Sequence, residues 1–426
     1  MFSKIIYLAG TLIRNKKIFR NYGFLLKSQD WDIKTLQNHQ FQMLRALLDH
    51  AYQHSEYYKK KFQQLNILPD SIKSLEDLNK IPILTKQELL QNSSTIQIKS
   101  GSEKLFYSET SGSTGKPLVF YRNMDWDAWH RASVYRGYHW YGVKPWDRNG
   151  YLWGYNLSPR RRIKTRFLDL LQNRFRLFSY KDDEIDVFIN KLKKASFLGG
   201  YSSMIYEIAK KVNTKKPRPE FSLKMVKGTS EKIFEKYQVE VQRAFGRKII
   251  SEYGAAEAGI IAFECPFGNM HMNMETVLVE EENNEIIVTN LVSKSFPIIR
   301  FKLGDYVEID RQEKCRCGMQ HYIIKDVLGR VGKVIYGYKD QYPSLTLYYV
   351  FKNLAMEHDL ILNYLAIQSQ RGHLKVEVEN GLTSPHLTLL INEFKKYFQD
   401  DLDVQIFDNM ELKSANKKKT DFISEL

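Results

Sequence analysis

The stretch Tyr107-Ser-Glu-Thr-Ser-Gly-Ser-Thr-Gly-Lys-Pro117 carries more information than any other part of this chain. It crowds hydroxyl residues between two glycines and ends on a lysine, in the order Ser111, Gly112, Ser113, Thr114, Gly115 and Lys116. A loop of this composition directs backbone N–H groups and hydroxyls toward one point, as an anionic phosphate requires. It is not a Walker loop, because position 110 is threonine and Pro117 replaces the Mg²⁺-binding Ser or Thr. The alternative is a plain turn rich in Ser and Gly.

The composition predicts a folded protein of two domains. The chain has 426 residues, of which 43% are hydrophobic and 13% aromatic, enough to exclude a disordered protein. No apolar run of about 18 residues exists, so no membrane-spanning helix is predicted. The apolar start of the chain is broken at Gly10 and Thr11 and has no small-residue cleavage site, unlike a signal peptide. We therefore expect a cytoplasmic protein, with a peripheral place at the inner face of the membrane as an alternative.

The net charge of +15 favours anionic ligands, membranes or nucleic acids. No helix-turn-helix, paired zinc-finger or RNA-binding pattern is present, so we expect no nucleic-acid partner. The basic run 160–166 is most simply a solvated helix face, or else a site for CoA phosphates, an acidic carrier protein or an anionic sugar precursor. Residues 3–20 place Ile5, Ile6, Leu8, Leu12 and Ile13 at helical spacing beside several basic residues. We prefer a helix docked on the large domain, with a membrane-surface helix as the alternative.

Hydrophobic periodicity divides the chain into three regions. Residues 29–95 read as amphipathic helices, with Ser74 and Thr85 as expected N-caps. From about 105 to 330, helices alternate with strand-like runs at 197–201, 248–253, 285–290 and 306–310, which predicts an α/β domain. The tail has strand-like runs at 373–379 and 404–407 and a helix at about 387–398. We therefore predict a large domain over 1–330 and a small α+β domain over 331–426.

Three shorter motifs carry chemistry. We expect a strand to deliver Tyr253, Gly254 to open a turn, and Glu257 to follow, so that tyrosine can stack on a purine and glutamate can hold Mg²⁺. The simpler interpretation is a strand-to-helix turn with a solvated acid. Asp305 after Gly304 suits a carboxylate that accepts both hydroxyls of a ribose, although Gly-Asp is also a common hairpin signal. Arg330 lies at the expected domain boundary, where a surface turn is the alternative.

All three cysteines belong to one metal-binding pattern. Cys265 and His271 form Cys-x5-His, and Cys315 and Cys317 form Cys-x-Cys. Three thiolates and one imidazole make a closed tetrahedral set that suits structural Zn²⁺. Clustered cysteines in a cytosolic enzyme bind metal more often than they pair as disulfides. The alternative is a set of buried free thiols.

Together, in this order, these motifs resemble the phenylacetate–CoA ligase branch of the adenylate-forming superfamily, which includes the CapK-like proteins linked to capsule and surface-polysaccharide synthesis. The resemblance covers nearly the whole chain, and segments 48–58, 81–89, 199–202 and 228–231 also carry it. It implies a large α/β N-terminal domain of several subdomains and a small, rotating α+β C-terminal domain. It also implies attack of a carboxylate on the α-phosphorus of ATP, giving an acyl-adenylate, and transfer of the acyl group to CoA or another acceptor.

The resemblance also implies roles for single residues. The residues expected to contact ATP or AMP are Ser111, Gly112, Ser113, Thr114, Gly115, Lys116, Gly228, Thr229, Ser230, Glu231, Tyr253, Gly254, Asp305 and Arg330. The first loop would hold the phosphates, Gly228–Glu231 would border the adenine and the acyl pocket, and Tyr253 would stack on adenine. Asp305 would bind the ribose, and Glu257 would hold Mg²⁺. Some members of the branch carry zinc at the place that matches the cysteines.

The superfamily also uses a lysine near its C-terminus to bridge the substrate carboxylate and the α-phosphate. Aligning Phe422–Ser424 with the family's ending makes Lys418 the best candidate, with Lys417 and Lys419 as alternatives. The usual Ser-Gly before that lysine is Asn416-Lys417 here, and the acidic hinge residue that often follows Gly329-Arg330 is absent. These departures motivate a second hypothesis, a non-catalytic nucleotide-binding or scaffold protein of a polysaccharide-synthesis complex. The acyl acceptor stays open among CoA, a carrier protein and a sugar, and related enzymes often form dimers.

Overall fold

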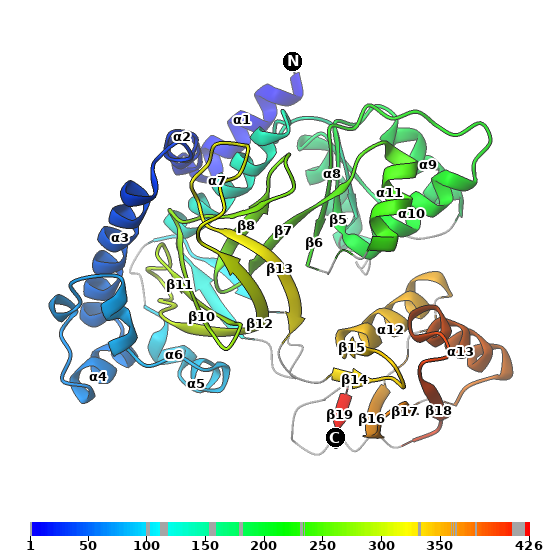
Figure 1. Cartoon of the computed structure of the whole chain (residues 1–426). Coiled ribbons are helices and arrows are strands. Elements are labelled where there is room, and N and C mark those ends of the chain that lie inside the picture. Colours follow the sequence, from blue (N-terminus) through cyan, green and yellow to red (C-terminus); the bar gives the residue numbers. More distant parts are fainter. Residues whose placement is uncertain are drawn as a thin grey trace. The chain divides into compact units, whose positions relative to one another are not determined.

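The computed structural model describes residues 2–98, 103–110, 118–152, 159–178, 182–230, 233, 235–330, 334–358, 360, 362, 364–379, 381–410 and 422–426. These residues form two compact units, one up to Leu328 and the other from Gly329 onward (Figure 1). The large unit is a mixed α/β structure, and the small unit combines a short sheet with two helices. Among the described helices, none is long and apolar enough to cross a bilayer.

The large unit is built on one mixed sheet of eleven described strands. Their spatial order is β10 (Val277–Glu282), β11 (Glu285–Asn290), β12 (Phe301–Asp310), β13 (Ile323–Arg330), β9 (Met270–Met272), β8 (Gly259–Glu264), β7 (Ile249–Ala255), β6 (Met225–Thr229), β5 (Phe197–Tyr201), β3 (Asn149–Leu152) and β4 (Arg174–Arg176). From β4 to β7 the neighbouring strands run parallel. The pairs β7–β8, β8–β9, β9–β13, β12–β11 and β11–β10 are antiparallel.

The parallel half follows from the alternation of strands and helices. Helix α9 (Asp182–Leu192) precedes β5, α10 (Ser202–Thr214) connects β5 to β6, and α11 (Glu235–Phe245) connects β6 to β7. Parallel neighbours need such crossover helices. Helix α10 buries Ile205, Ile208, Ala209 and Val212, at the spacing of a single helix face. The predicted strands 197–201 and 285–290 are confirmed as β5 and β11, and 248–253 falls in β7.

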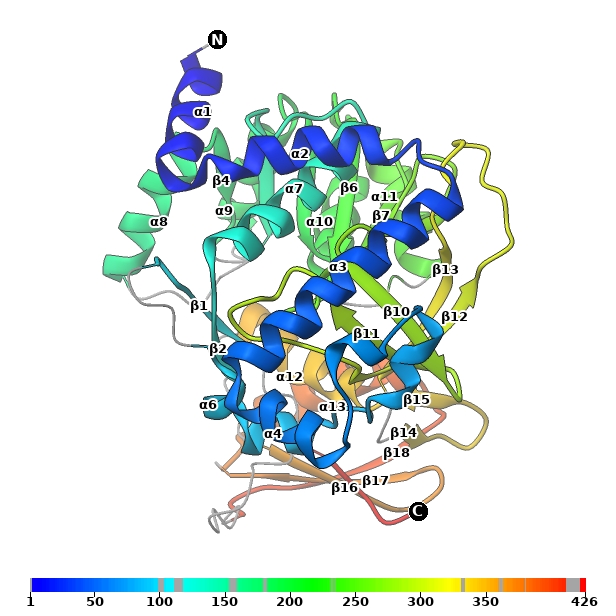
Figure 2. The ribbon, with the colours of Figure 1, turned by 90° about the vertical axis from the view of Figure 1, so that its left-hand side faces the viewer.

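The N-terminal region is helical, as predicted. Helices α1 (Phe2–Asn15) and α2 (Lys17–Ser28) are followed by α3 (Ile33–His54) and α4 (Glu56–Gln64), with α2 packed along α7 (Met124–Trp140) (Figure 2). Short helices follow at Pro69–Ser71, Glu76–Lys80, α5 (Lys86–Gln91) and α6 (Ser93–Ile96). Thr85 is the N-cap of α5 as predicted, since its Oγ1 accepts from Glu88 N at 3.2 Å, whereas the N-cap of Glu76–Lys80 is Leu75 and Ser74, one residue earlier, accepts from Asp77 N through Oγ at 3.4 Å.

The antiparallel hairpin β1 (Phe106–Glu109) and β2 (Val119–Arg122) frames the Ser/Gly-rich stretch in the sequence. Thr110 N donates to Leu118 O, and Leu118 N donates to Thr110 Oγ1, each at 3.0 Å. Residues 111–117 lie outside the described part of the chain. Helix α8 (Pro159–Leu171) follows β3.

The small unit is the predicted α+β structure. Its sheet has the order β18 (Asp403–Phe407), β17 (His373–Val378), β16 (Tyr364–Gln370) and β19 (Phe422–Ser424), and β14 (Val334–Tyr336) pairs with β15 (Gln341–Pro343). Helices α12 (Leu345–Glu357) and α13 (Ser384–Phe398) pack together. They share a core with the sheet, in which Leu354, Leu390 and Phe394 lie against Leu374 and Val376.

Two segments that were predicted to contain glycine turns, at Gly254 and at Gly304-Asp305, lie in β-strands. Gly254 was expected to open a turn, but it lies in β7 opposite Ile260, and the turn comes at residues 256–258. The connection is therefore strand-to-strand and not strand-to-helix. Asp305 was expected after a glycine turn, but it lies in β12. There Gly304 has φ +85°, and the pairing with β11 shifts register opposite this segment, which makes a β-bulge.

Candidate functional site

The candidate site begins at the carboxyl ends of the parallel strands. In register, Gly200 of β5 pairs with Gly228 of β6, which pairs with Ser251 of β7. The carboxyl ends of β5, β6 and β7 therefore meet at one edge of the sheet. In open α/β sheets, ligands bind outside this edge. Thr229 ends β6, Ser230 follows it, and Tyr253 lies near the end of β7, so three of the predicted residues share this edge.

Close packing explains the glycines at this edge. A Cβ at Gly228 would lie 2.4 Å from Ser202 Oγ, and one at Gly200 would lie 2.4 Å from the carbonyl oxygen of Leu152. Any side chain at these positions would separate adjacent strands or displace α10. Ser230, which follows β6, has φ +64°, a left-handed conformation that is uncommon for a residue with a Cβ. Such conformations gather at functional sites.

Tyr253 and Asp305 are brought into direct contact. The Tyr253 hydroxyl donates to Asp305 Oδ2 at 2.8 Å, although the residues are 52 positions apart. In the strand order β12 stands four places from β7, which in a flat sheet would be about 19 Å. The sheet must therefore curl, and the β12 bulge turns Asp305 toward the end of β7. The two side chains expected at the adenine and the ribose thus lie in one place.

Glu257 lies in the turn between β7 and β8 and is buried, with 8% of its surface exposed. The alternative of a solvated acid is therefore wrong. Asn290 Nδ2 donates to the Glu257 carbonyl at 3.0 Å, which fixes the turn against β11. A buried carboxylate near anionic phosphates is the donor type that Mg²⁺ takes.

A buried ion pair next to Thr229 was not predicted. Lys227 Nζ lies 2.7 Å from Glu252 Oε1, with side chains only 8% and 9% exposed. Thr229 Oγ1 also donates to Glu252 Oε1 at 3.3 Å, whereas Glu252 Oε2 is buried without a hydrogen-bond partner. Burial alone would lower the pKa of Lys227, but the charge of Glu252 outweighs it and holds that pKa above its usual value. The sequence signal was a lysine inside the apolar strand Met225–Thr229.

Several predicted residues cannot be placed. Those outside the described residues are Ser111, Gly112, Ser113, Thr114, Gly115, Lys116, Glu231 and Lys418. Arg330 ends β13, and only its backbone is described. Two aromatic side chains of α7 serve packing, since Tyr135 packs with Ile18 and Ala128, and Trp140 packs beside the cysteines.

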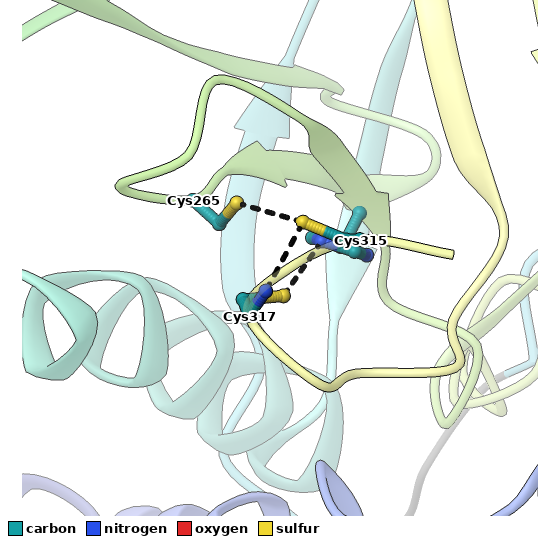
Figure 3. Close-up of side chains that lie close together, drawn as sticks. Cys265, Cys315 and Cys317 are labelled. Atoms are coloured by element: carbon teal, nitrogen blue, oxygen red, sulfur yellow. Dashed lines mark hydrogen bonds between the residues drawn. The ribbon is translucent and has the colours of Figure 1, made fainter. Parts of the chain in front are cut away.

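The cysteine and histidine side chains converge as the sequence predicted. Cys265 follows β8, His271 lies in β9, and Cys315 and Cys317 lie in the loop between β12 and β13. Their four ligand atoms all lie within 4.8 Å of one another. Cys265 Sγ is 3.7 Å from Cys315 Sγ, and Cys317 Sγ is 3.2 Å from His271 Nε2. Figure 3 shows the three thiols directed toward one another.

These separations fit a tetrahedral zinc ion. Zn–S bonds of about 2.3 Å and a Zn–N bond of about 2.0 Å place two sulfurs about 3.8 Å apart, and sulfur and nitrogen about 3.5 Å apart. His271 Nδ1 lies 3.3 Å from the carbonyl oxygen of His321. A hydrogen on Nδ1 satisfies that carbonyl and leaves the Nε2 lone pair for a metal, which is the usual arrangement of metal-binding histidines.

Burial favours the neutral forms of Cys265, Cys317 and His271, whereas at Cys315 it is outweighed by hydrogen bonds from Cys317 and Asn269, which lower the pKa of that thiol. Burial raises the pKa of Cys265, raises that of Cys317 to about 12, and lowers that of His271 to about 4. A neutral imidazole is ready to bind metal, whereas the thiols need a cation to become thiolates. The donor set therefore fits Zn²⁺ and is poor as a set of free thiolates.

The comparisons with known proteins agree with this fold. No protein-family model matches the chain. CapK of Staphylococcus aureus is 25% identical over 312 residues, which cover 70% of this chain and 68% of CapK. The phenylacetate-coenzyme A ligases of Escherichia coli (strain K12) and Pseudomonas putida are 35% and 32% identical over 127 residues. Those residues cover 29% of this chain and 29% of each ligase, so the sequence match spans less than a third of the ligases.

Solved structures extend the likeness to the whole fold. 2-Hydroxyisobutyryl-CoA ligase in the postadenylation state, in complex with R3-HIB-AMP, matches with a TM-score of 0.64 at 15% identity. The match covers 94% of this chain and 91% of that structure. The open conformation of the same ligase, with 2-HIB-AMP and CoA, matches with a TM-score of 0.59 at 16% identity, covering 91% of each chain. The chain therefore has the fold of an adenylate-forming ligase, and its sequence is similar to CapK and, over less than a third of its length, to the phenylacetate-coenzyme A ligases.

Proposed function

We propose that this protein activates a carboxylic acid with ATP to an acyl-adenylate and passes the acyl group to a second nucleophile. The observation that carries the proposal is the 2.8 Å hydrogen bond between Tyr253 and Asp305 at the carboxyl edge of the parallel strands. It joins the two residues expected at the adenine and the ribose, although four strand positions separate them. An adenosine bound there would direct its phosphates along the edge formed by Gly228, Thr229 and Ser230.

Each side chain then has a defined task. Asp305 accepts hydrogen bonds from the ribose hydroxyls, and Tyr253, held by Asp305, stacks on the adenine. Residues 111–115 and Lys116 receive the phosphates, with Arg330 at the nucleotide and Glu231 at the border of the acyl pocket. Glu257 would hold Mg²⁺, which neutralises phosphate charge. Lys418 would bridge the substrate carboxylate and the α-phosphate, which makes positioning the main contribution of the protein.

The proposed reaction has two displacements. A carboxylate oxygen of the acid attacks the α-phosphorus, and the bond from that phosphorus to the pyrophosphate oxygen breaks. A thiolate or another nucleophile then attacks the acyl carbon, and AMP leaves with the electron pair of the broken C–O bond. We propose that residues 1–330 bind ATP and that residues 331–426 rotate between the two steps.

The acceptor is a finer proposal. The 2-hydroxyisobutyryl-CoA ligase structures hold an acyl-AMP and CoA, which supports CoA as the acceptor here. A carrier protein or a sugar is the alternative acceptor. This alternative stays open because CapK, which has the longest alignment among the relatives described above, is not named as a CoA ligase. We place the reaction in the synthesis of capsule or another surface polysaccharide, with the protein as a homodimer in the cytoplasm or at the inner face of the membrane.

We propose that the cysteine site holds structural zinc. Four protein ligands fill a tetrahedron and leave no open position for catalysis. The ion would tie the segment after β8 to the loop before β13, close to the last strand of the large unit. Its contribution would be to stability.

ATP–pyrophosphate exchange tests the central proposal. A panel of aryl, fatty, hydroxy and amino acids is assayed with wild-type protein and with Lys418→Ala, with Lys417→Ala and Lys419→Ala as matched controls. We expect acid-dependent exchange that only Lys418→Ala abolishes. Equal loss in a neighbouring lysine variant would move the catalytic role to that residue. Binding of ATP without exchange for any acid, by folded wild-type protein, would favour the second candidate function, a non-catalytic nucleotide-binding scaffold, which the altered lysine tail motivates.

A further inference from the structure

Two helices from distant parts of the sequence expose a shared group of large apolar side chains. Helices α1 and α8 pack against each other, and Figure 2 shows them side by side at one end of the large unit. We define the α1–α8 surface by six exposed apolar residues, Ile5, Leu12 and Ile13 of α1 and Ile163, Phe167 and Leu170 of α8; Leu168 of α8 is also exposed, at 44%, but lies off this stripe. Ile13 is 88% exposed and Leu170 is 72% exposed. Contiguous exposed apolar groups of this kind mark interaction sites.

The spacing shows that each helix presents a single apolar stripe. On α1, Leu12 and Ile13 follow Ile5 by seven and eight residues, and on α8, Phe167 and Leu170 follow Ile163 by four and seven. These intervals place side chains on one face of a helix. The exposure therefore belongs to a whole face of each helix and not to scattered residues.

The opposite face of α1 is the one that docks, through polar contacts and through the Tyr7 ring, which packs on Tyr135 and Trp146. Tyr7 and Tyr135 share a hydrogen bond of 2.6 Å between their hydroxyls, Asn15 Nδ2 donates to the Met124 carbonyl at 2.7 Å, and Arg14 pairs with Asp127 at 3.2 Å. A helix that covers a core normally buries its apolar stripe. Here the polar face is buried and the apolar stripe faces outward. The sequence-based expectation of a docked helix holds, but not through its apolar residues.

The charges carried by α1, α2 and the first ten residues of α8 are all positive, although Arg14 and Lys17 pair with Asp127 and Asp125 of α7. Residues 2–28 hold six basic residues and no acidic one, and residues 159–168 hold five basic residues and no acidic one. The nearest acid of α8, Asp169, is buried and paired with Arg176 at 2.8 Å. In the described part of the chain, the exposed Lys16, Lys164 and Arg166 make no ion pair with a carboxylate.

We propose that the α1–α8 surface binds an anionic lipid bilayer. The apolar stripes would enter the boundary between headgroups and acyl chains, as interfacial amphipathic helices do. Lys16, Lys164 and Arg166 would keep their charges at the phosphates while their stems cover apolar surface. A second copy of the chain is the poorer occupant, because an isologous contact would bring two basic surfaces together. The inference rests on this surface and not on the proposed ligase reaction.

Vesicle flotation of the full-length protein tests the proposal. The vesicles are phosphatidylcholine alone and phosphatidylcholine mixed with phosphatidylglycerol. We expect flotation with the anionic vesicles and its loss at high salt, where the Debye length falls to about 3 Å. The double variant Ile13→Gln, Phe167→Gln should lower the partition coefficient about 100-fold, since each buried apolar side chain contributes about tenfold. Replacing Lys164 or Arg166 by Gln should lower it about fivefold each.

The matched control is the double variant Val187→Gln, Val239→Gln, which changes exposed apolar residues of α9 and α11 outside the surface. We expect it to float like wild type. All these positions are exposed, so circular dichroism and melting temperature should not change in any variant. Equal flotation with neutral vesicles, no flotation, or variants that float like wild type would each overturn the proposal. So would a vesicle-independent dimer that the Ile13→Gln, Phe167→Gln variant abolishes, which would assign the surface to a second copy.

Discussion

Replacing Cys317 with Ser tests whether zinc holds the large unit together. Cys317 is half-buried, so a serine hydroxyl there does not become a fully buried polar group, and the change mainly removes a ligand. The metal would link Cys265 to Cys315 across 50 residues. In the chain-entropy treatment of cross-links, closing such a loop stabilises the folded state by about 4 kcal/mol. For a unit of this size, each kcal/mol of lost stability lowers the melting temperature by about 2 °C. We therefore expect the melting temperature to fall by about 8 °C.

Metal analysis and thermal unfolding measure this prediction together. Wild-type protein should carry one zinc ion per chain, and a strong chelator should lower its melting temperature to that of Cys317→Ser. The variant itself should not respond to the chelator. His386→Asn changes a half-buried histidine of the small unit, away from the cysteines in the sequence, and should leave both readings unchanged. Zinc-free wild-type protein, or a chelator effect of equal size in wild type and variant, would refute the cross-link.

Three further predictions concern the large unit and the nucleotide. Glu275→Gln should destabilise the protein by about 3–5 kcal/mol at pH 7, because it leaves Arg136, 2.5 Å from Glu275 Oε1 and 1% exposed, without its counter-charge. Buried Glu275 would have a raised pKa, but the charge of Arg136 holds that pKa well below its usual value. Ionised Glu275 therefore stabilises the folded protein fully above the unfolded-state pKa of Glu275. This stabilisation disappears as pH falls through the folded-state pKa of Glu275. Urea unfolding at a series of pH values should show that the free energy of unfolding falls at acid pH in wild type and does not do so in Glu275→Gln. The same acid dependence in the variant would show that Glu275 is not the group responsible. Gly137→Ala should lower the free energy of unfolding by about 1–3 kcal/mol, because the added Cβ would lie 2.6 Å from the Phe263 ring. Gly10→Ala, with open space around it, is the control and should not destabilise the protein. Equal chemical-denaturation midpoints for the two variants would argue against this packing. Asp305→Ala should weaken ATP binding at least tenfold by calorimetry, and Tyr253→Phe, which keeps the ring and loses the 2.8 Å hydrogen bond, should weaken it less. The reverse order would mean that the Tyr253 hydroxyl contributes more to ATP binding than the Asp305 carboxylate does, which contradicts the ribose role of Asp305.

Local patterns predicted the elements well because each depends on neighbouring residues. The runs 197–201 and 285–290 become strands with the predicted bounds, and Thr85 caps its helix. The convergence of Cys265, His271, Cys315 and Cys317 was also predictable, because the residue types themselves define a metal-binding pattern and the protein has only these cysteines. These features need no knowledge of which strand lies beside which.

The missed features depend on register and curvature. The Lys227–Glu252 pair exists because β6 and β7 are aligned so that Thr229 lies opposite Glu252, and periodicity within one strand does not fix the register of its partner. Gly254 and Gly304 read as turns because glycine favours both turns and bulges, and only the pairing of β7 with β8 and of β12 with β11 separates the two cases. The outward apolar face of α1 was missed in the same way, since polar contacts to α7 decided which face docks.

The proposed zinc ligands, the Glu275 ion pair and the candidate nucleotide residues belong to one continuous framework. His271 Nδ1 lies 3.3 Å from the His321 carbonyl, His321 Nε2 lies 3.1 Å from Glu275 Oε1, and Glu275 holds Arg136 of α7. The loop with Cys315 and Cys317 lies between β12, which carries Asp305, and β13. Metal loss would therefore release one end of β12, whose bulge must hold Asp305 against Tyr253. It follows that zinc removal should weaken ATP binding as well as lower the melting temperature. A metal-free protein that keeps wild-type ATP affinity below its melting range would show instead that the bulge is held by β11 alone.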